Sequence, residues 1–437
     1  MTYAFYNFLW KLIDYFLINY LNFRVEKGKE IKSRLNERFG KCYLRKENKK
    51  IIWIHGSSVG ESVAALALAN SMLKNGFDKK KFHFLITTNT VTSSNFVNNK
   101  IKNGFPGTHQ FNPLDNPKFV NKFLDFWTPE MAIFVESDFW PNLIYRSSVK
   151  KIPLILASSQ MSIKSSRFWR GLGRGLAKKV FKKIDLVLAV DPFHAELFKS
   201  LGSKKVKSLT SLKSIAEKPQ VNIEYILKLK SCLKNKNIFL AASTHPGEEE
   251  ILIKLANNLR SKGIDNILII ITPRHIERGK DIKKLILSAG YDIKCRSNDE
   301  LPSQSDYFYL ADTMGEMGSL IEISNLVFVA GSLVKKIGGH NPIEAASLGK
   351  AVIMGPYTEK CDAQINDLVW SGGAIKIENS PEFKNVFIEK VISLLNQPLI
   401  LEDMGKNALD ACSYAQLRAD EASDYLLEIF KNRSVIK

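Results

Sequence analysis

The sequence predicts an α/β protein with two doubly wound parallel sheets. Short apolar runs rich in β-branched residues alternate with amphipathic helical patterns, as they do where crossover helices join parallel strands. The same plan occurs on both sides of about residue 215. A chain of 437 residues that is 45% hydrophobic is long and apolar enough for about two domains with buried cores. A mainly disordered chain is therefore excluded.

Nine apolar runs predict the strands of these sheets. They lie at 51–55, 82–87, 131–136, 153–158 and 186–190 in the first half, and at 237–243, 267–272, 326–331 and 351–355 in the second. Helices such as 248–263 separate them, and a long amphipathic helix begins near residue 402. The polar residues around Pro219 place the link between the sheets within 213–220. We therefore divide the chain into residues 1–40, 41–215 and 216–437.

The charge of the chain is concentrated in its first half. The formal net charge is +19, from 63 Lys and Arg against 44 Asp and Glu. Residues 1–215 hold 36 of these cations and 15 of the anions, a surplus of +21, whereas residues 216–437 hold 27 and 29. The first half is therefore expected to meet an anionic partner, and nucleic acid, a membrane surface and a phosphorylated substrate all fit the sign.

Residues 3–22 are the membrane candidate of the chain. They are dense in aromatic and aliphatic side chains, are interrupted by Lys11 and Asp14, and are followed by five Lys and Arg between positions 24 and 34. A spanning helix needs about 18 uninterrupted apolar residues, and a signal peptide ends in a small-residue cleavage site. We expect a membrane-associating helix that lies in or dips into the cytoplasmic leaflet. A first helix packed on the protein is the alternative.

The cysteine pattern and the absence of common cofactor motifs disfavour several classes of site and reaction. Five cysteines, an odd number spread along the chain without a C-x-x-C pair, argue against a disulfide framework or a zinc ribbon. The sequence contains no G-x-G-x-x-G fingerprint, no P-loop lysine motif and no H-x-x-x-H pair. NAD dependence, NTP hydrolysis and metal chemistry are therefore disfavoured.

Two acids lie at or shortly after the carboxyl ends of predicted strands of the first half. Glu61, in WIHGSSVGES (53–62), lies where a strand passes through a turn into a helix, so its carboxylate can act on a substrate hydroxyl as a general base. Glu136 alternates with Asp138 in VESDFWPNLI, so only one of them faces the ligand edge, and we favour Glu136 because it is nearer the strand. A helix-start acid and a solvated loop acid are the alternatives.

Basic and glycine-rich segments end strands of both halves. Arg274 and His275, in TPRHIERG, are placed to meet a phosphate, and Lys213 is a further cation at a strand end. In DTMGEMGSL (312–320) and in residues 330–356, small residues precede a helix and leave backbone N–H groups for phosphate oxygens. Solvated surface cations and an ordinary well-capped helix would give the same patterns.

The second of these glycine-rich segments also carries side chains suited to a nucleoside. Gly338 and Gly339 permit close backbone approach to a ligand. Asn341 and Pro342 read as helix-start residues. Glu344, one turn on, is placed to accept hydrogen bonds from ribose hydroxyls.

In these segments the sequence resembles the 3-deoxy-D-manno-octulosonic acid (Kdo) transferases, membrane-associated enzymes of lipopolysaccharide inner-core synthesis. The resemblance runs in order over nearly the whole chain, through WIHGSSVGE, ESDFWPNL, SLKS, PRHIER, DTMGEMG and GGHNPIEAASLGKAVIMGP. It implies a GT-B fold with two Rossmann-like domains facing a central cleft, CMP-Kdo as donor, a lipid A precursor as acceptor, inversion at the anomeric carbon, and no metal or other cofactor. It also implies a place at the cytoplasmic face of the inner membrane, with residues 41–215 binding the acceptor and residues 216–437 binding CMP-Kdo.

The resemblance also assigns roles to single residues. The family's general base falls on Glu61, and its two transition-state-stabilising positions fall on Glu136 and Lys213. Its CMP-binding positions fall on Pro273, Arg274, Met314, Gly315, Glu316, Asn341, Pro342, Ile343 and Glu344. The chain departs from the family at residues 158–162, where S-S-Q-M-S replaces the usual N-A-R-L-S and Gln160 takes the place of an arginine, and at Thr210 and Ser211, where G-N is common.

Two other functions fit parts of the sequence. One is another lipid-directed glycosyltransferase, or a nucleotide-sugar epimerase, on the same architecture. The other is a non-enzymatic protein that binds nucleic acid or anionic lipid through the basic stretch 164–183, in which Phe168 and Trp169 lie among cations. We expect no nucleic-acid partner, because this stretch equally suits a helix that presents cations to phospholipid headgroups or lipid A phosphates.

Overall fold

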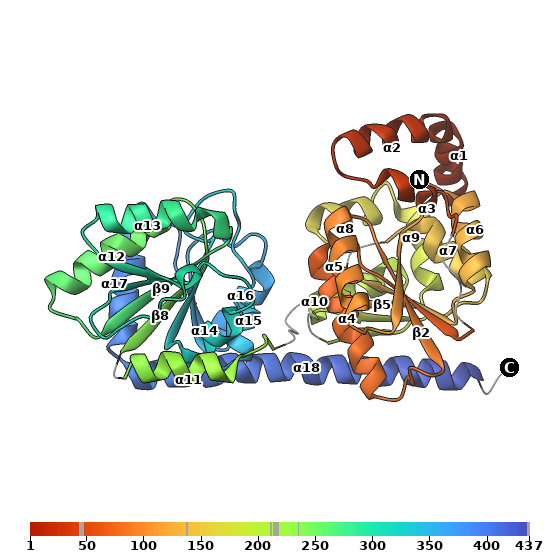
Figure 1. The fold of residues 1–437 in the computed structure, drawn as a ribbon. Helices are drawn as coiled ribbons and strands as arrows, with labels where there is room; N and C mark the ends of the chain where they lie inside the picture. The colour runs from red at the N-terminus through yellow and green to blue at the C-terminus, as the bar shows by residue number, and fades with distance from the viewer. Residues whose placement is uncertain (43–47, 137–138, 210–211, 213–217, 235, 435–437) are drawn as a thin grey trace. The chain divides into compact units, whose positions relative to one another are not determined.

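The computed structural model describes residues 1–42, 48–136, 139–209, 212, 218–234 and 236–434 (Figure 1). The chain forms two compact units, residues 1–213 together with 415–437, and residues 214–414. Each unit is built on a parallel sheet of seven strands within the described residues, so the expected pair of doubly wound α/β sheets is confirmed. Residues 415–434 pack with the first unit, although our division of the sequence places them with the second sheet.

The sheet of the first unit has the strand order β3-β2-β1-β4-β5-β6-β7. Its strands are β1 (Lys50–His55), β2 (Phe82–Thr88), β3 (Gly107–Phe111), β4 (Met131–Val135), β5 (Leu154–Ser159), β6 (Leu186–Ala189) and β7 (Val206–Ser208). The helices are α1 (Tyr3–Ile13), η1 (Asp14–Phe16), α2 (Leu17–Glu26), η2 (Lys32–Arg34), α3 (Leu35–Arg38), α4 (Val59–Lys74), α5 (Val91–Lys102), α6 (Pro117–Trp127), α7 (Pro141–Val149), α8 (Ile163–Arg170), α9 (Arg174–Val180), η3 (Phe181–Lys183) and α10 (Pro192–Leu201).

The sheet of the second unit has the order β10-β11-β9-β8-β12-β13-β14. Its strands are β8 (Asn237–Thr244), β9 (Ile267–Pro273), β10 (Ile293–Cys295), β11 (Phe308–Leu310), β12 (Leu326–Val329), β13 (Ala351–Met354) and β14 (Ala374–Lys376). The helices are α11 (Ile223–Cys232), α12 (Glu249–Ser261), η5 (Ile276–Arg278), α13 (Gly279–Ser288), η6 (Arg296–Asn298), α14 (Met317–Ile323), α15 (Ile343–Ser347), α16 (Asp362–Trp370), α17 (Phe383–Leu395) and α18 (Pro398–Ser434).

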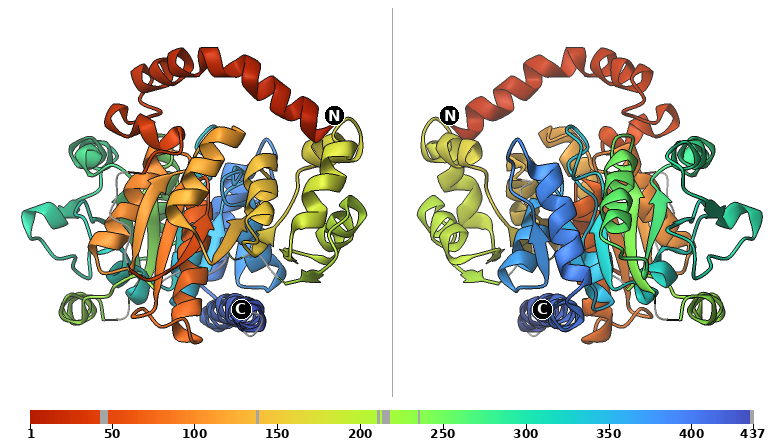
Figure 2. Two further views of the ribbon diagram at one scale, coloured as in Figure 1. Left: turned by 90° about the vertical axis from the view of Figure 1, so that its right-hand side faces the viewer. Right: turned by 90° about the vertical axis from the view of Figure 1, so that its left-hand side faces the viewer.

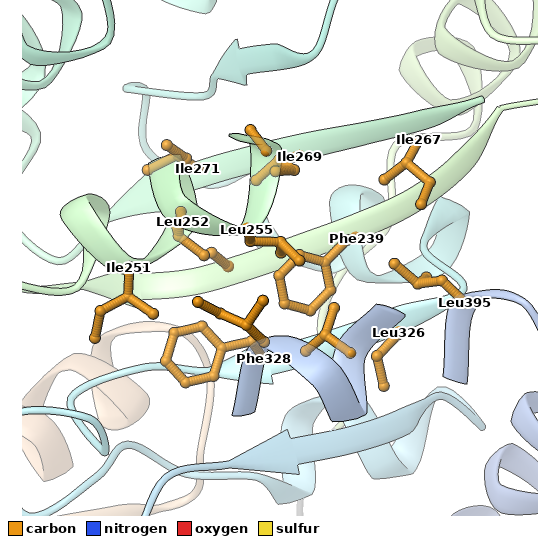
Figure 3. Close-up of a cluster of buried hydrophobic side chains, with 14 of the residues drawn as sticks. Phe239, Ile251, Leu252, Leu255, Ile267, Ile269, Ile271, Leu326, Phe328 and Leu395 are labelled. Carbon is orange, nitrogen blue, oxygen red and sulfur yellow. The ribbon is translucent and has the colours of Figure 1, made fainter. Parts of the chain in front are cut away.

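Continuous apolar strands give both sheets two covered faces. In β8, Phe239 and Ala241 join a core with α12, α13 and α17, whereas Leu240 joins a second core with α11, α14 and α16 on the opposite face. Figure 3 shows the first of these cores, in which Phe239, Leu255 and Phe328 are fully buried. Because every residue of such a strand faces a layer of helices, the strand reads as an unbroken apolar run rather than an alternating one.

The strands that our reading of the sequence missed are short and lie toward the sheet margins. They are β3, β7, β10, β11 and β14, none longer than five residues. β3, β7, β10 and β14 are edge strands, and β11 is next to one. An edge strand pairs on one side and needs fewer apolar residues, so sequences such as GTHQF and VKS do not stand out.

The N-terminal segment forms two helices with a 3₁₀ turn between them. Tyr3 and Tyr6 anchor α1 to the body of the first unit, where their hydroxyls donate to Asn142 Oδ1 at 2.6 Å and to Asp115 Oδ2 at 2.8 Å. A row of large apolar side chains on the same helices is exposed, from Phe5 at 52% to Phe16 at 70%. Within the described residues, no helix combines the length and apolar character that crossing a membrane requires.

The basic stretch 164–183 forms α8, α9 and η3 beside the start of α1. The N-terminal amine of Met1 donates to the Leu172 carbonyl, and α1 contacts α9, so the N terminus lies next to these helices in Figure 2. Lys178 and Lys182 are exposed there, and Leu172, between α8 and α9, is 81% exposed. One surface of the first unit therefore combines exposed cations with exposed apolar side chains.

Candidate active site

Glu61 lies in the first turn of α4, at the carboxyl edge of the first sheet. β1 ends at His55, and Gly56 to Ser58 form the turn before the helix. The N-cap hydroxyl of Ser58 accepts from Glu61 N at 3.3 Å, and Ser57 N donates to Glu61 Oε2 at 2.6 Å. A Cβ on Gly56 would lie 2.9 Å from the Glu61 carbonyl, so the turn closes this tightly only with glycine. The turn thereby fixes the carboxylate where a parallel sheet presents its ligand site.

Further hydrogen bonds support this turn from behind. Asn89, directly after β2, donates from Nδ2 to Ser57 Oγ. Its side-chain oxygen accepts from Arg38 Nη1 at 3.1 Å, and its carbonyl oxygen accepts from Arg38 Nη2 at 2.6 Å. Arg38 is buried and pairs with Glu30 at 3.1 Å. A chain of contacts therefore runs from Glu61 to Arg38 through two loops at the edge of the sheet.

Glu136 lies directly after β4 in a strained backbone conformation. Its φ is 66°, in the left-handed region that non-glycine residues rarely adopt, and it is 2% exposed. Its N–H donates to the Ala157 carbonyl at 2.9 Å, and its Oε2 accepts from Gln160 Nε2 at 3.0 Å. Strain of this kind costs about 1–3 kcal/mol and is concentrated at functional sites. Gln160, where the family usually has arginine, is thus a direct partner of this carboxylate.

Lys213 lies outside the described residues, as do Asp138, Thr210 and Ser211. Its neighbour Leu212 is held at the same edge of the first sheet, where Leu212 N donates to Ser158 Oγ at 3.0 Å. Ser158 also has a positive φ, 53°, at the end of β5. The structure therefore brings Glu61 and Glu136 to one edge of the first unit.

The other nine candidates line the carboxyl edge of the second sheet. Pro273 ends β9, and Arg274 is exposed just beyond it, with its N–H donating to the Thr244 carbonyl at 3.1 Å. Met314 is 79% exposed, Gly315 has a φ of 88°, and Glu316 pairs with Arg296 at 2.9 Å. Met314, Gly315 and Glu316 directly precede α14.

The last four candidates lead into α15, which begins at Ile343. Asn341 Oδ1 accepts from Ile343 N at 3.1 Å, which bears out the expected start of a helix here. Asn341 and Glu344 are exposed, whereas Pro342 and Ile343 are buried. α15 has five residues and α14 seven, so each carries little dipole beyond the N–H groups of its first turn.

Three histidines gather at the same edge of the second sheet. His245 Nε2 and His340 Nε2 are 2.8 Å apart with nearly parallel rings, and the His275 ring centroid lies 6.3 Å from that of His245. One nitrogen of the close pair must accept, so the two imidazoles hold one proton between them at that contact. Gly331, at a φ of 73°, leaves room for His340, since its Cβ would lie 3.1 Å from that ring.

This cluster disfavours positive charge on its own imidazoles. Burial, together with repulsion from His245, Arg274 and Lys360, lowers the pKa of His340 to about 4. The pKa of His245 is lowered for the same reasons, burial first and then His275 and Arg278. The positive charge at this edge therefore comes from Arg274 and Lys360, and such cations are suited to hold an anion. Within the described residues, no group of three or more His, Cys, Asp or Glu side chains is arranged to hold a metal ion.

Buried Glu248 ties together the loops that carry the histidines. Its carboxylate accepts from the N–H groups of His245, Gly331 and Leu333 at 2.8 to 3.0 Å. Burial raises the pKa of Glu248 and these three donors oppose the rise. Our reading of the sequence placed His275 at a phosphate and considered His245 and His340 only as metal ligands. It did not single out Glu248, although acids in STHPGEEE follow β8.

Comparison with known proteins identifies the family of the chain. A family model described as 3-Deoxy-D-manno-octulosonic-acid transferase (kdotransferase) matches residues 33–216. A 3-deoxy-D-manno-octulosonic acid transferase of Rickettsia bellii is 34% identical over 416 residues, which cover 95% of this chain and 96% of that protein. The chain belongs to the Kdo transferase family.

Two further similarities extend this result. A 3-deoxy-D-manno-octulosonic acid transferase of Haemophilus influenzae is 32% identical over 358 residues, 81% of each chain. A UDP-GlcNAc 2-epimerase of Neisseria meningitidis matches in structure with a TM-score of 0.52 and 13% identity, over 84% of this chain and 98% of that one. The second likeness shows the fold alone, which is GT-B-like. This Kdo transferase is a glycosyltransferase. It shares its fold with an enzyme that acts on a nucleotide sugar in a different reaction.

Proposed function

We propose that this Kdo transferase, which takes Kdo from CMP-Kdo in lipopolysaccharide core synthesis, transfers it to a sugar hydroxyl of a lipid A precursor with Glu61 as general base. The observation that carries the proposal is the position of Glu61, whose carboxylate is fixed by Ser57 N at the carboxyl edge of the first sheet. In the proposed division of labour, the first unit binds the acceptor and the second unit binds the donor.

The proposed step forms one bond and breaks one. Glu61 takes the proton from the acceptor hydroxyl as its oxygen attacks the anomeric carbon of Kdo from the face opposite the phosphate. The bond from that carbon to the phosphate oxygen breaks, and CMP leaves with the electron pair. The configuration at the anomeric carbon is inverted. The proposed step uses no metal or other cofactor.

Charge development in this step assigns roles to the other candidates. The anomeric carbon becomes oxocarbenium-like, and the buried Glu136 carboxylate offsets that positive charge. The leaving phosphate becomes more negative, and Lys213 and Arg274 offset that charge. Glu344 and Asn341 hold the ribose, and the backbone around Met314, Gly315 and Glu316 and around Pro342 and Ile343 holds the nucleotide.

The histidine cluster supports the assignment of the donor to the second unit. CMP-Kdo carries a phosphate and a carboxylate, and His245 and His340 lie within the field of Arg274. Because α14 and α15 are short, we assign the stabilisation of the phosphate mainly to these side chains rather than to helix dipoles.

In this proposal, the first unit also binds the membrane. The exposed row from Phe5 to Phe16 on α1 and η1 would enter the apolar boundary of the cytoplasmic leaflet of the inner membrane, while Lys178 and Lys182 meet anionic headgroups or acceptor phosphates. This arrangement combines both readings of residues 3–22, because Tyr3 and Tyr6 pack on the protein while other side chains face outward.

The test is the mass of the product. Purified enzyme is incubated with CMP-Kdo and a lipid A precursor in detergent, and the lipid is expected to gain the mass of Kdo. Glu61→Gln keeps the shape of the side chain but removes the base, so the rate should fall about 10³-fold while CMP affinity stays within twofold. Near-normal turnover of Glu61→Gln, or an isomerised nucleotide sugar as product, contradicts the proposal.

A further inference from the structure

Ser57, in the turn before α4, joins Glu61 to the loop after β2. Its N–H donates to Glu61 Oε2 at 2.6 Å. Its carbonyl oxygen accepts from Asn89 N at 3.2 Å and from Ser93 Oγ at 3.2 Å, and its hydroxyl oxygen accepts from Asn89 Nδ2. Asn89 therefore holds Ser57 at two points, one on the backbone and one on the side chain.

Arg38 in turn holds Asn89 at two points. Its Nη1 donates to Asn89 Oδ1 at 3.1 Å, and its Nη2 donates to the Asn89 carbonyl at 2.6 Å. The same guanidinium donates from Nη1 to the Asn112 carbonyl at 3.0 Å and from Nε to Glu30 Oε2 at 3.1 Å. Because the guanidinium is planar and its donors point in fixed directions, these contacts hold the loops after β2 and β3 in a fixed relation to Glu30.

Stability alone does not explain this arrangement. Arg38 is 4% exposed, and burial lowers its pKa while the pairing with Glu30 opposes that shift. Removing charges from water costs several kcal/mol per ion, and replacing a buried ion pair by apolar side chains is often neutral or stabilising. Apolar side chains would pack these loops together at a lower desolvation cost, but they would not set the direction of the Asn89 amide. The buried ion pair is therefore suited to fixing a position.

The position of the Glu61 carboxylate is what such a network can fix. Glu61 is half-buried and follows a turn of glycine and serine residues, so its long side chain is not held in place by core packing. A general base must lie within about 2.6–3.2 Å of the atom whose proton it takes. A shift of about 1 Å can lower a rate about 10²-fold.

We propose that Asn89 and Arg38 are positioning residues for the general base, an inference that rests on the proposed function. Asn89 holds Ser57, and Arg38 holds Asn89, without contact between either residue and the reacting atoms. Loss of either frees the turn before α4, so the Glu61 carboxylate spends less time at the acceptor hydroxyl. Because Glu30 and Arg38 precede β1, the N-terminal segment serves the reaction as well as the proposed contact with the membrane.

The first test compares two asparagines at opposite ends of α4. Asn89→Ala removes the amide that holds Ser57, so kcat is expected to fall about tenfold while the KM for CMP-Kdo and the affinity for CMP stay within twofold. Asn75→Ala is the matched control, because Asn75 is also half-buried and donates from Nδ2 to the Asp420 carbonyl at 3.3 Å. Both variants should lower the melting temperature modestly, but only Asn89→Ala should lower kcat.

Arg38→Lys tests the guanidinium itself. Lysine keeps a positive charge beside Glu30 but lacks the planar fork, so it cannot donate to Glu30, Asn89 and Asn112 together. The expected result is again a lower kcat with an unchanged KM for CMP-Kdo. A wild-type kcat in this variant would show that Arg38 does not act through Asn89.

A double variant separates positioning from a structural role. A residue that acts through Glu61 has nothing to position once the base is removed, so adding Asn89→Ala to Glu61→Gln should lower the residual rate less than about twofold. A further tenfold loss in that background, a wild-type kcat in Asn89→Ala, or an equal loss of kcat in Asn75→Ala would overturn the inference. Near-normal turnover of Glu61→Gln would instead refute the base, and with it the proposed function.

Discussion

The two units have the same kind of sheet but opposite chemistry at its carboxyl edge. Glu61, Glu136 and Asp115 lie at this edge in the first unit, whereas His245, His340 and Arg274 lie there in the second. The formal charges of the two halves run the other way, since residues 1–215 carry +21 and residues 216–437 carry −2. The net charge of a unit therefore does not indicate which charged groups gather at the carboxyl edge of its sheet.

The largest effects are expected when one candidate residue is replaced at each of the two sheet edges. Glu61→Gln should lower kcat about 10³-fold and leave CMP binding unchanged, because the proposed base does not touch the nucleotide. Arg274→Gln should instead weaken CMP binding about 10- to 100-fold, because the proposal gives Arg274 a charged hydrogen bond to the phosphate. Calorimetric titration of both variants with CMP checks the contrast. Equal losses of CMP affinity would abolish the distinction between the units.

The surface charge of the first unit should matter for the membrane alone. Replacing Lys178 and Lys182 with glutamine should weaken binding to anionic vesicles about 25-fold, since each lysine near such a surface contributes about 1 kcal/mol. Vesicle flotation at fixed salt measures this. The control replaces Lys79 and Lys80, which are exposed ahead of β2, and should have little effect. If both pairs weaken binding equally, only the overall charge of the unit matters.

A smaller effect is expected where the chain departs from its family. Gln160→Arg would place a cation beside Glu136 Oε2, which Gln160 now contacts at 3.0 Å. The cation should offset part of the charge with which Glu136 stabilises the anomeric carbon in the proposed step, so kcat should fall about threefold. Gln304→Arg, at an exposed position of the second unit, is the control. An unchanged kcat would mean that the charge of Glu136 does not contribute to the rate.

The smallest expected effects concern stability, and their signs differ between the units. Burial raises the pKa of Asp115 from 3.8 to about 7, so its contribution to the free energy of unfolding is full below about pH 4 and is lost as the pH rises through 7. Burial lowers the pKa of His340 from 6.5 to about 4, so its contribution is full above about pH 6.5 and is lost as the pH falls through 4.

Melting temperatures across this pH range test both signs. The difference between wild type and Asp115→Asn should shrink as the pH rises from 4 to 7. The difference between wild type and His340→Asn should grow as the pH rises from 4 to 6.5. Parallel curves for wild type and a variant would show that the group in question does not titrate differently in the folded protein.

The sequence predicts the sheets well and the margins of the sheets poorly. Each predicted strand has a counterpart, because strands buried on both faces are continuous apolar runs. The 3₁₀ turn at Asp14–Phe16 was not expected, since an aromatic row with helical spacing does not reveal where the helix changes direction.

In the candidate site, too, the sequence predicts local features and misses contacts between distant residues. Motifs next to strand ends locate Glu61, Glu136 and Arg274, because each depends on its own strand and turn. The contact of His245 with His340 joins residues 95 positions apart, and the contact of Arg38 with Asn89 joins residues 51 apart. Such contacts depend on strand order, which a single sequence leaves open. Gln160 is an intermediate case, since the lost arginine was visible but its contact with Glu136 was not.

The path of α18 has a consequence for how the chain is made. Residues 415–434 belong to the first unit, where Asp420 accepts from Ser71 and the Phe430 ring packs on Phe77 and Phe82. A ribosome adds about 5–20 residues per second, so synthesis of residues 214–414 separates the body of the first unit from this helix by about 10–40 s. During that interval α4 and β2 lack the helix that covers them. The unit that carries the apolar α1 is therefore completed only after the second unit has been synthesised.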